Sequence, residues 1–210
     1  MICIIKVERL KYMAEVLESI AIYHSKSLIE KAKKGNEHAY GKLVGLWFKR
    51  IYNFSLKYFA DHDLAMEVTQ LTFITAYQKI DRLNNVESFK YWLYKIALNN
   101  CREEDRRYKR KRWYSIFVSE DIKKMESKFG HPEQEYHQKE KEELVANALR
   151  KLPEEQKTVI ILKEYEGLKF REISDTLNIS ENTAKSRLYY GFKTLRKLLE
   201  ESELNFKRES

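Results

Sequence analysis

The sequence predicts an all-α protein of two small helical domains joined by a flexible linker. Only two prolines and six glycines occur among its 210 residues, so few positions would interrupt a helix. Apolar residues recur at three- and four-residue spacing through most of the chain, as one buried helix face requires. After Trp113, about thirty residues have weak periodicity, an acidic bias and the turn sequence Gly130-His131-Pro132, which together indicate a linker. We therefore divide the chain into an N-terminal helical extension (1–25), a first domain (26–112), a linker (113–137), a second domain (138–202) and a polar tail (203–210).

The first domain begins with a short helix from Ser27 to Lys34, which Gly35-Asn36 should end. A long helix follows, and its apolar stripe predicts packing against a bundle. That stripe consists of Tyr40, Leu43, Val44, Trp47, Ile51, Phe54 and Tyr58. The polar run Asp61-His62-Asp63 breaks this pattern and should start the next helix.

The next helix, predicted over Leu64–Ile80, has apolar residues on two sides. One stripe contains Leu64, Val68, Leu71 and Thr75, and the other contains Phe73, Tyr77 and Ile80. A helix that is apolar on two sides is usually held between neighbours. Glu67, Gln70 and Ile74 lie between the stripes, so we predict that this narrow strip is the free surface, either solvated or in contact with another protein.

The last helix of the first domain follows the polar loop Asp81–Glu87, with Ser88 as its predicted N-cap. Its predicted bundle face contains Phe89, Trp92, Leu93, Ile96 and Asn100, and its outward face contains Tyr91, Lys95, Leu98, Arg102, Arg106 and Lys109. Aromatic rings can stack on unpaired bases, and cations displace phosphate counterions. The outward face is therefore a candidate nucleic-acid surface, and the alternative is an ordinary solvated basic face.

The second domain is predicted to contain four helices and to end in a helix-turn-helix. Pro153 suits the first turn of its second helix, and Gly167 should end that helix. Phe170, Ile173, Ser174 and Leu177 then share one face of a short helix; Asn178 tolerates positive φ, and Ser180 can cap the following helix. That final helix should run from Glu181 to about Leu199, with Ala184, Leu188, Gly191 and Leu195 inward. Its outward face offers hydrogen-bonding and cationic side chains that can enter a major groove: Asn182, Lys185, Ser186, Tyr189 and Lys193. The alternative is a helical hairpin with a solvated face.

Charge and cysteine content narrow the function classes. The formal net charge is +8, and Arg102–Arg112 alone carries seven basic and three acidic residues, which favours a polyanionic partner. Cys3 and Cys101 are far apart, so neither a disulfide framework nor a zinc site is expected. No apolar run could serve as a signal peptide or span a bilayer, so a cytoplasmic protein without membrane insertion is expected. No cofactor or metal site is expected either, and the absence of any catalytic constellation argues against an enzyme.

Two segments of the chain resemble a known family. The run LPEEQKTVIILKEYEGLKFREISDTLNISENTAKSRLYYGFKTLRKLL resembles region four of bacterial sigma factors. The runs DLAMEVTQLTFITAYQKI and FKYWLYKIALNNCREEDRR resemble their region two. With both regions in this order and no recognisable domain between them, the chain over residues 26–200 is similar to the extracytoplasmic-function (group IV) sigma factors. It departs from the family pattern at Leu71, Ser174, Asn178 and Tyr190, where the family usually has an acid, Ala, Gly and Arg.

The resemblance implies a role for each surface. The second domain would read the −35 promoter element through the outward residues of its last helix and through Thr183 on the same helix. The −10 element would contact Asn84, Asn85, Ser88, Tyr91, Lys95, Asn99, Arg102 and Arg106. Core RNA polymerase would bind Glu67, Gln70, Leu71 and Ile74 through its β′ clamp coiled coil, and the second domain through its β flap. An anti-sigma factor is a further candidate partner, and the free chain is expected to be a monomer.

The main alternative to a sigma factor is a self-sufficient helix-turn-helix regulator with an N-terminal sensor or dimerisation domain. Such a domain would show a ligand pocket or a symmetric interface pattern. The first domain instead shows a basic, aromatic helix face and a narrow polar strip. The sequence therefore favours an initiation factor that has no catalytic activity of its own.

Overall fold

The computed structural model describes residues 25–118 and 144–209, with side chains described over 25–110 and 144–202. The predicted N-terminal extension, most of the predicted linker and the side chains of the polar tail lie outside these ranges. Every regular element in the described ranges is helical, as an all-α fold requires. None of the helices in this part of the chain is long and apolar enough to cross a membrane.

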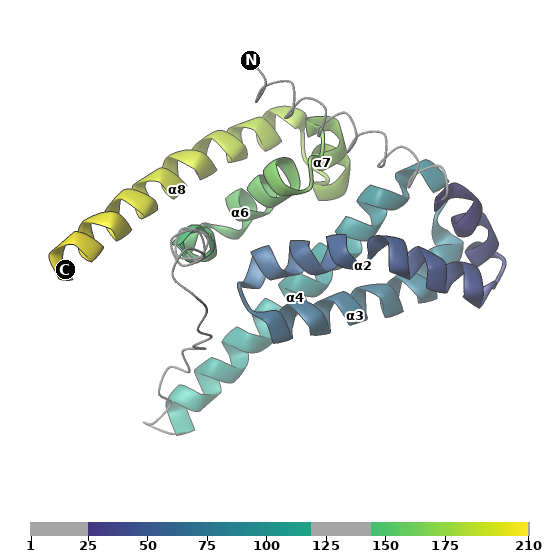
Figure 1. Ribbon diagram of the computed structural model, residues 1–210, viewed down its shortest axis with the longest axis horizontal. Coiled ribbons are helices and arrows are strands. Elements are labelled where there is room, and N and C mark those ends of the chain that lie inside the picture. The colour runs from purple at the N-terminus through teal and green to yellow at the C-terminus, as the bar shows by residue number, and fades with distance from the viewer. Residues whose placement is uncertain (1–24, 119–143, 210) are drawn as a thin grey trace, which may run out of the picture.

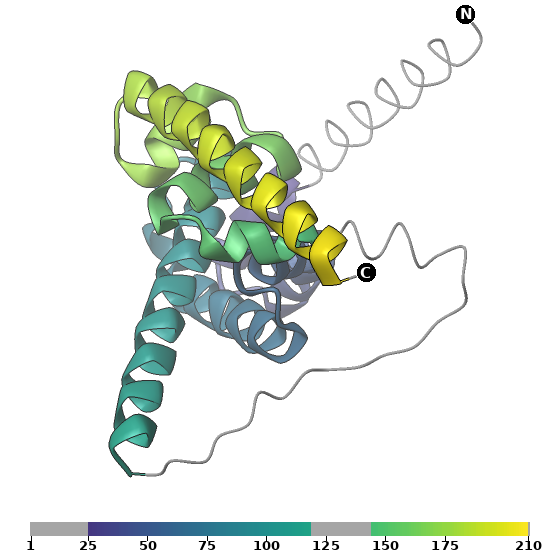
Figure 2. The ribbon, with the colours of Figure 1, turned by 90° about the vertical axis from the view of Figure 1, so that its left-hand side faces the viewer.

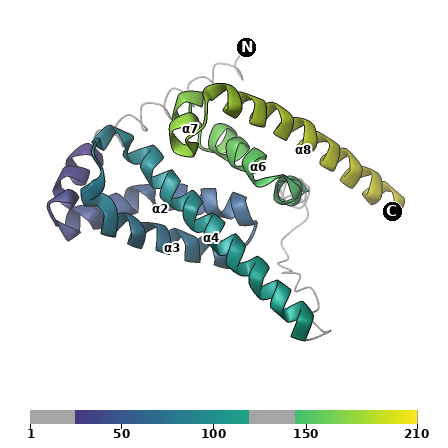
Figure 3. The same ribbon diagram turned by 180° about the vertical axis from the view of Figure 1, so that it is seen from behind.

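The first domain is a bundle built around α2, α3 and α4 (Figure 1). After helical residues 25–33, its elements are α2 (Glu37–Phe59), α3 (His62–Lys79), the 3₁₀ turns η1 (Ile80–Arg82) and η2 (Val86–Ser88), and α4 (Phe89–Val118). Seen from behind, α4 crosses α2 and α3 and then extends beyond them (Figure 3). Its helix therefore continues past the Tyr108–Trp113 stretch where the sequence pattern had placed its end.

In the second domain, the shorter helices lie between the last helix, α8, and the first bundle (Figures 1 and 2). After helical residues 144–151, its elements are α6 (Glu154–Ile160), the π-helical turn η3 (Ile161–Tyr165), α7 (Phe170–Leu177) and α8 (Glu181–Glu209). The helix α7, the short turn and α8 form the predicted helix-turn-helix. The last helix ends at Glu209 and is longer than expected, since the apolar periodicity predicted its end near Leu199.

The predicted start and stop signals act as expected at most helix ends. Asn36 was expected to end the preceding helix with Gly35, and it also caps α2, because its Oδ1 accepts a hydrogen bond from the Ala39 amide at 2.8 Å. At the start of α3, Asp61 Oδ1 accepts one from the Leu64 amide at 2.9 Å. Asn178 has a φ of 54° at the end of α7. Ser180 Oγ accepts from the Thr183 amide at 3.0 Å and so caps α8. These caps satisfy backbone groups that the helices leave unpaired.

The predicted cap at Ser88 is wrong. The side chain that caps this turn belongs to Asn85, whose Oδ1 accepts from the Glu87 amide at 2.9 Å. The Ser88 hydroxyl instead donates to the carbonyl of Asn85 at 2.6 Å. A 3₁₀ turn thus precedes α4, and it moves the cap three residues upstream.

The prediction that α3 is buried on two apolar sides is also wrong. Its buried face consists mainly of small residues: Ala65, Val68, Thr69, Thr72, Phe73 and Ala76. The hydroxyls of Thr69 and Thr72 donate to backbone carbonyls four residues earlier, at 2.6 and 2.7 Å, which lets these polar residues pack like small apolar ones. Leu71 and Tyr77 are instead 40% and 44% exposed.

On α4, the prediction that Leu98 faces outward is wrong, because Leu98 and the neighbouring Tyr94 are fully buried. Tyr94 contacts both domains: the centroid of its ring lies 5.5 Å from that of Phe54 on α2, and its hydroxyl donates to Glu166 of the second domain. The α7 helix of the second domain packs against α4, while η3 packs against α2. Apolar residues of the second domain, including Ile161 and Leu168, belong to the same continuous core as the α2 stripe. A helix with one face in its own bundle can thus bury another against a different domain.

The contact between α8 and α6 depends on Gly191. A Cβ atom there would lie 2.9 Å from Ile160 Cδ1 and 3.3 Å from Gln156 Cβ. We expect Gly191→Val to lower the free energy of unfolding by about 1–3 kcal/mol, because α8 must move away from α6. Gly45→Val on α2 is the matched control, since no atom lies within 4 Å of its added Cβ. Urea denaturation followed by circular dichroism measures both, and equal losses would contradict this packing.

Candidate nucleic-acid and protein-binding surfaces

The outward face of α8 is as predicted in geometry. All six predicted residues are exposed: Asn182, Thr183, Lys185, Ser186, Tyr189 and Lys193. Ala184 and Gly191 are buried on the opposite side, so the helix shows one face to its domain and the other to solvent. Tyr189, at 68% exposed, is the most exposed large hydrophobic residue of the described chain.

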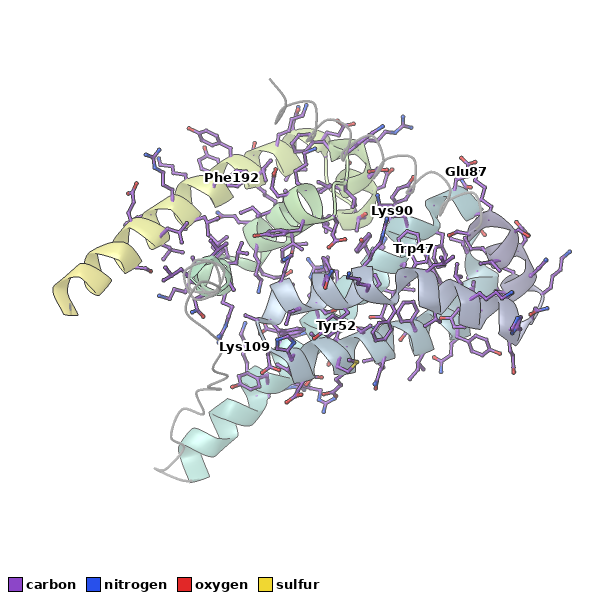
Figure 4. The ribbon with its side chains drawn as sticks, viewed as in Figure 1. Trp47, Tyr52, Glu87, Lys90, Lys109 and Phe192 are labelled. Carbon is purple, nitrogen blue, oxygen red and sulfur yellow. The ribbon has the colours of Figure 1, made fainter. Side chains whose placement is uncertain are left out.

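The structure adds two residues to this face that the sequence reading missed. Phe192, labelled on α8 in Figure 4, is 42% exposed. Arg196 is also exposed and pairs with Glu200 of the same helix at 3.0 Å. Both follow Tyr189 at helical spacing, by three and seven residues. A phenylalanine at helical spacing usually belongs to the core, so the sequence did not identify Phe192 as an exposed residue.

Arg187 is on the flank of α8 and does not reach outward. Its guanidinium forms an ion pair with Glu155 of α6 at 2.9 Å, and its side chain is only 24% exposed. Arg187 therefore ties α8 to α6.

The predicted basic face of α4 is divided by the second domain. Lys95, Asn99 and Arg106 are exposed, as are the loop residues Asn84 and Asn85. Ser88, Tyr91 and Arg102 are half-buried. Part of the predicted face thus remains open, while another part lies at the boundary between the two domains.

Acidic residues of the second domain approach the half-buried part of this face. Arg102 Nε donates to Glu154 Oε1 of α6 at 2.7 Å. Burial raises the pKa of Tyr91, and the α7 carboxylates of Glu172 and Asp175 raise it further. Glu172 and Tyr91 also line one cavity of about 220 Å³. Other members of the α4 face have acidic partners on α4 itself, as in the Arg106–Glu103 pair at 2.9 Å.

The strip on α3 is exposed along its whole predicted length. Glu67, Gln70, Leu71 and Ile74 are all exposed, and Ile74 reaches 56%. Met66 and Tyr77 lie beside them and are 39% and 44% exposed. The strip is therefore more apolar than the sequence predicted. Contiguous exposed apolar side chains on a helix favour contact with another protein.

Polar contacts cross the boundary between the domains. Lys157 of α6 is buried, and its Nζ donates to the Tyr58 carbonyl at 3.3 Å and lies 3.8 Å from the centroid of the Tyr58 ring. Burial lowers the pKa of Lys157. The Tyr94 hydroxyl donates to Glu166 Oε2. Within the described ranges, no group of three or more His, Cys, Asp or Glu side chains could hold a metal ion.

Comparison with known families gives two matches that follow the same order along the chain. Residues 43–113 match the family described as Sigma-70 region 2. Residues 142–195 match the family described as Sigma-70, region 4. Together the matches cover more than half of the chain. They include the α3 strip, the first part of α4 and the helix-turn-helix.

Relatives named as sigma factors are similar over most of their length. The ECF RNA polymerase sigma-E factor of Haemophilus influenzae is 27% identical over 168 residues, covering 78% of this chain and 88% of the relative. The ECF RNA polymerase sigma factor SigW of Bacillus subtilis is 29% identical over 187 residues, covering 83% and 96%. These alignments extend across both domains.

Solved structures share the fold. CnrH, in complex with the cytosolic domain of CnrY, superposes with a TM-score of 0.63 at 21% identity, covering 84% of this chain and 97% of CnrH. The sigma factor RpoE of Bartonella quintana, in complex with the anti-sigma factor NepR, gives a TM-score of 0.56 at 22% identity, covering 76% and 96%. At these identities the likeness concerns the fold alone.

The buried carboxyl of Glu166 should make stability depend on pH. Burial raises the pKa of the Glu166 carboxyl. At pH values above the ordinary titration range of a glutamate, the native state therefore retains a proton that the unfolded chain has released. Its contribution to stability therefore falls as pH rises through this range. Glu166→Gln should gain stability over the wild type between about pH 4 and about pH 7, because an amide does not ionise. Urea denaturation across pH measures this, with exposed Glu164→Gln as the charge-matched control. A gain that stays constant with pH would contradict it.

Proposed function

The chain belongs to the extracytoplasmic-function group of the sigma-70 family, and from that premise we propose which of its surfaces bind promoter DNA and RNA polymerase. As an alternative sigma factor it directs transcription initiation. The observation that carries the proposal is the helix α8, which presents an uninterrupted hydrogen-bonding and cationic face away from its own domain. The first domain supplies two further surfaces, on α3 and α4.

We assign the outward face of α8 to the −35 element in the major groove. Lys185 and Tyr189 lie near the centre of this face, and Asn182 near its N-terminal end can reach base edges. Phe192 adds an aromatic ring to the face, and Arg196 extends it by three residues beyond Lys193. An exposed phenylalanine can contact thymine methyl groups, and an arginine can contact phosphate.

We assign the open part of the α4 face, with the preceding loop, to the −10 element. Lys95 and Arg106 are exposed cations that can neutralise backbone phosphates, and Asn99 between them can form hydrogen bonds. Asn84 and Asn85 are exposed on the loop. Arg102 and Tyr91 complete this surface when the second domain does not cover them.

We assign the α3 strip to core RNA polymerase. Its exposed apolar area, formed by Leu71 and Ile74 with the neighbouring Met66 and Tyr77, suits burial against a partner helix. Glu67 and Gln70 supply the polar rim that such interfaces usually have. The resemblance to the family points to the β′ clamp coiled coil as the partner of this strip and to the β flap as the partner of the second domain. The relative RpoE binds an anti-sigma factor, and we propose a protein of that class as a further partner.

The α8 assignment is tested by run-off transcription with core polymerase on a template that the wild-type chain transcribes. Lys185→Ala and Tyr189→Ala should each reduce initiation, since a lost base contact costs about 1–3 kcal/mol. Lys151→Ala is the matched control, because this exposed lysine lies in the helix before α6 and outside the assigned face. On a template whose −35 element is scrambled, all three variants should initiate as the wild type does. Unchanged initiation by both test variants on the intact promoter would remove the assignment.

The α3 assignment is tested by binding to core polymerase across a salt series. Ile74→Asp should weaken binding more than Glu67→Gln, because it places an unpaired charge in a desolvated contact. Binding should fall only weakly with salt, since the strip offers few charges to screen. Circular dichroism must first show that both variants are folded. Undiminished binding of Ile74→Asp would show that the polymerase contacts another surface.

A further inference from the structure

Two adjacent tyrosines form an exposed aromatic pair in the first half of α8. Tyr189 is 68% exposed and Tyr190 is 56% exposed. Their ring centroids lie 5.4 Å apart at an interplanar angle of 77°, which is the edge-to-face arrangement that aromatic rings favour. Each ring therefore restricts the other at the surface. Contiguous exposed aromatic side chains of this kind usually mark a binding site.

Tyr190 lies among the residues assigned to the −35 element, although the sequence analysis did not include it. Ser186 precedes it by four residues and Lys193 follows it by three, so these side chains are its neighbours on the helix surface. Both neighbours are exposed. Lys193 also follows Tyr189 by four residues and so lies next to both rings. The aromatic pair is therefore part of the outward face of α8.

The arginines in the described side chains of α8 are held in ion pairs. Arg187 pairs with Glu155 of α6 at 2.9 Å, and Arg196 pairs with Glu200 at 3.0 Å. A guanidinium reads guanine through hydrogen bonds to its O6 and N7 atoms. For either of these arginines, that contact would compete with the ion pair. At the centre of the face, α8 thus offers aromatic rings rather than a guanidinium.

An exposed ring at this position suits one base in particular. Among the four bases, thymine presents an apolar group in the major groove, its C5 methyl. An aromatic ring can bury this methyl without a hydrogen-bond partner. Tyrosine provides a large contact area with few rotatable bonds, so ordering it costs little conformational entropy. The edge-to-face contact lowers this cost further, because both rings are already restricted before DNA binds.

We propose that Tyr190, together with Tyr189, is a specificity-determining residue that reads thymine methyl groups in the −35 element. This inference rests on the proposed assignment of α8 to that element. It adds the chemistry by which the element is selected. The −35 element of this chain then contains thymine at base pairs that face the two rings, and recognition at these base pairs depends on burial of the methyl group.

Uracil tests the proposal, since it differs from thymine only in lacking the C5 methyl. Run-off transcription is measured with core polymerase and the full chain on a template that the wild type transcribes. Each thymine of the −35 element, on either strand, is replaced in turn by uracil. At one or more of these positions the wild type should lose about two- to fourfold in initiation, as expected for partial to full burial of one methyl group.

Three variants assign this effect to Tyr190. Tyr190→Ala should initiate equally well with thymine and with uracil at one of the sensitive positions. Tyr190→Phe should discriminate as the wild type does, because it keeps the ring and loses only the hydroxyl. Tyr108→Ala is the matched control, since Tyr108 of α4 is 55% exposed and lies outside the assigned surfaces; it should also discriminate as the wild type does. Circular dichroism shows whether each variant is folded.

Methyl reading is overturned if the −35 element contains no thymine or if the wild type responds to uracil at no position. It is also overturned if folded Tyr190→Ala keeps the full discrimination, or if Tyr190→Phe or Tyr108→Ala loses it. Failure of the α8 assignment has a different signature, because Lys185→Ala and a scrambled −35 element would then leave initiation unchanged. If both of these reduce initiation while uracil has no effect, only methyl reading is wrong.

Discussion

The burial of Tyr94 and Leu98 on α4 is the contact on which the arrangement of the two domains depends. Both side chains are fully buried, and α7 of the second domain packs against this helix. Apolar residues of the second domain then join the core of the first, so that one continuous core spans both. The position of α8, and with it the direction in which its outward face points, follows from this contact.

The helix α4 serves three purposes because successive residues lie 100° apart around its axis. One side, with Leu93 and Ala97, packs inside the first bundle. On the next side Leu98 is buried, and Tyr94 contacts both Phe54 of the first bundle and Glu166 of the second domain. Lys95 and Asn99 lie on the remaining side and are exposed. Because these sides adjoin, the residues at their edges, Tyr91 and Arg102, belong both to the proposed nucleic-acid surface and to the boundary between domains.

The boundary differs from a permanent core in its polar content. A buried lysine, an unpartnered tyrosine hydroxyl and an ion pair lie beside well-packed apolar residues. Interfaces between domains that must separate are generally more polar than domain cores. The proposed function places the two domains on two promoter elements, and the polar content of the boundary lowers the cost of separating them.

Local signals in the sequence determined most of the helices and the faces of α2 and α8. The α2 stripe and the outward face of α8 follow from helical periodicity, and Asn36, Asp61, Asn178 and Ser180 act as the expected helix signals, because these effects depend on neighbours within one or two turns. The exposed strip on α3 was located correctly, but its apolar character was not predicted. Threonines that bond to their own backbone take positions in the core, and large apolar side chains that were expected there lie at the surface instead.

Only the tertiary structure decided which parts of α4 are accessible. The pattern placed Leu98 with the outward residues because periodicity describes a helix and its nearest bundle, and carries no information on a domain some fifty residues later in the chain. The same limit applies to Arg102. Its helical spacing predicts that it is exposed, but does not predict that its ion-pair partner is Glu154 of α6. Contacts between distant segments depend on how whole faces fit together, and helical spacing alone does not encode that fit.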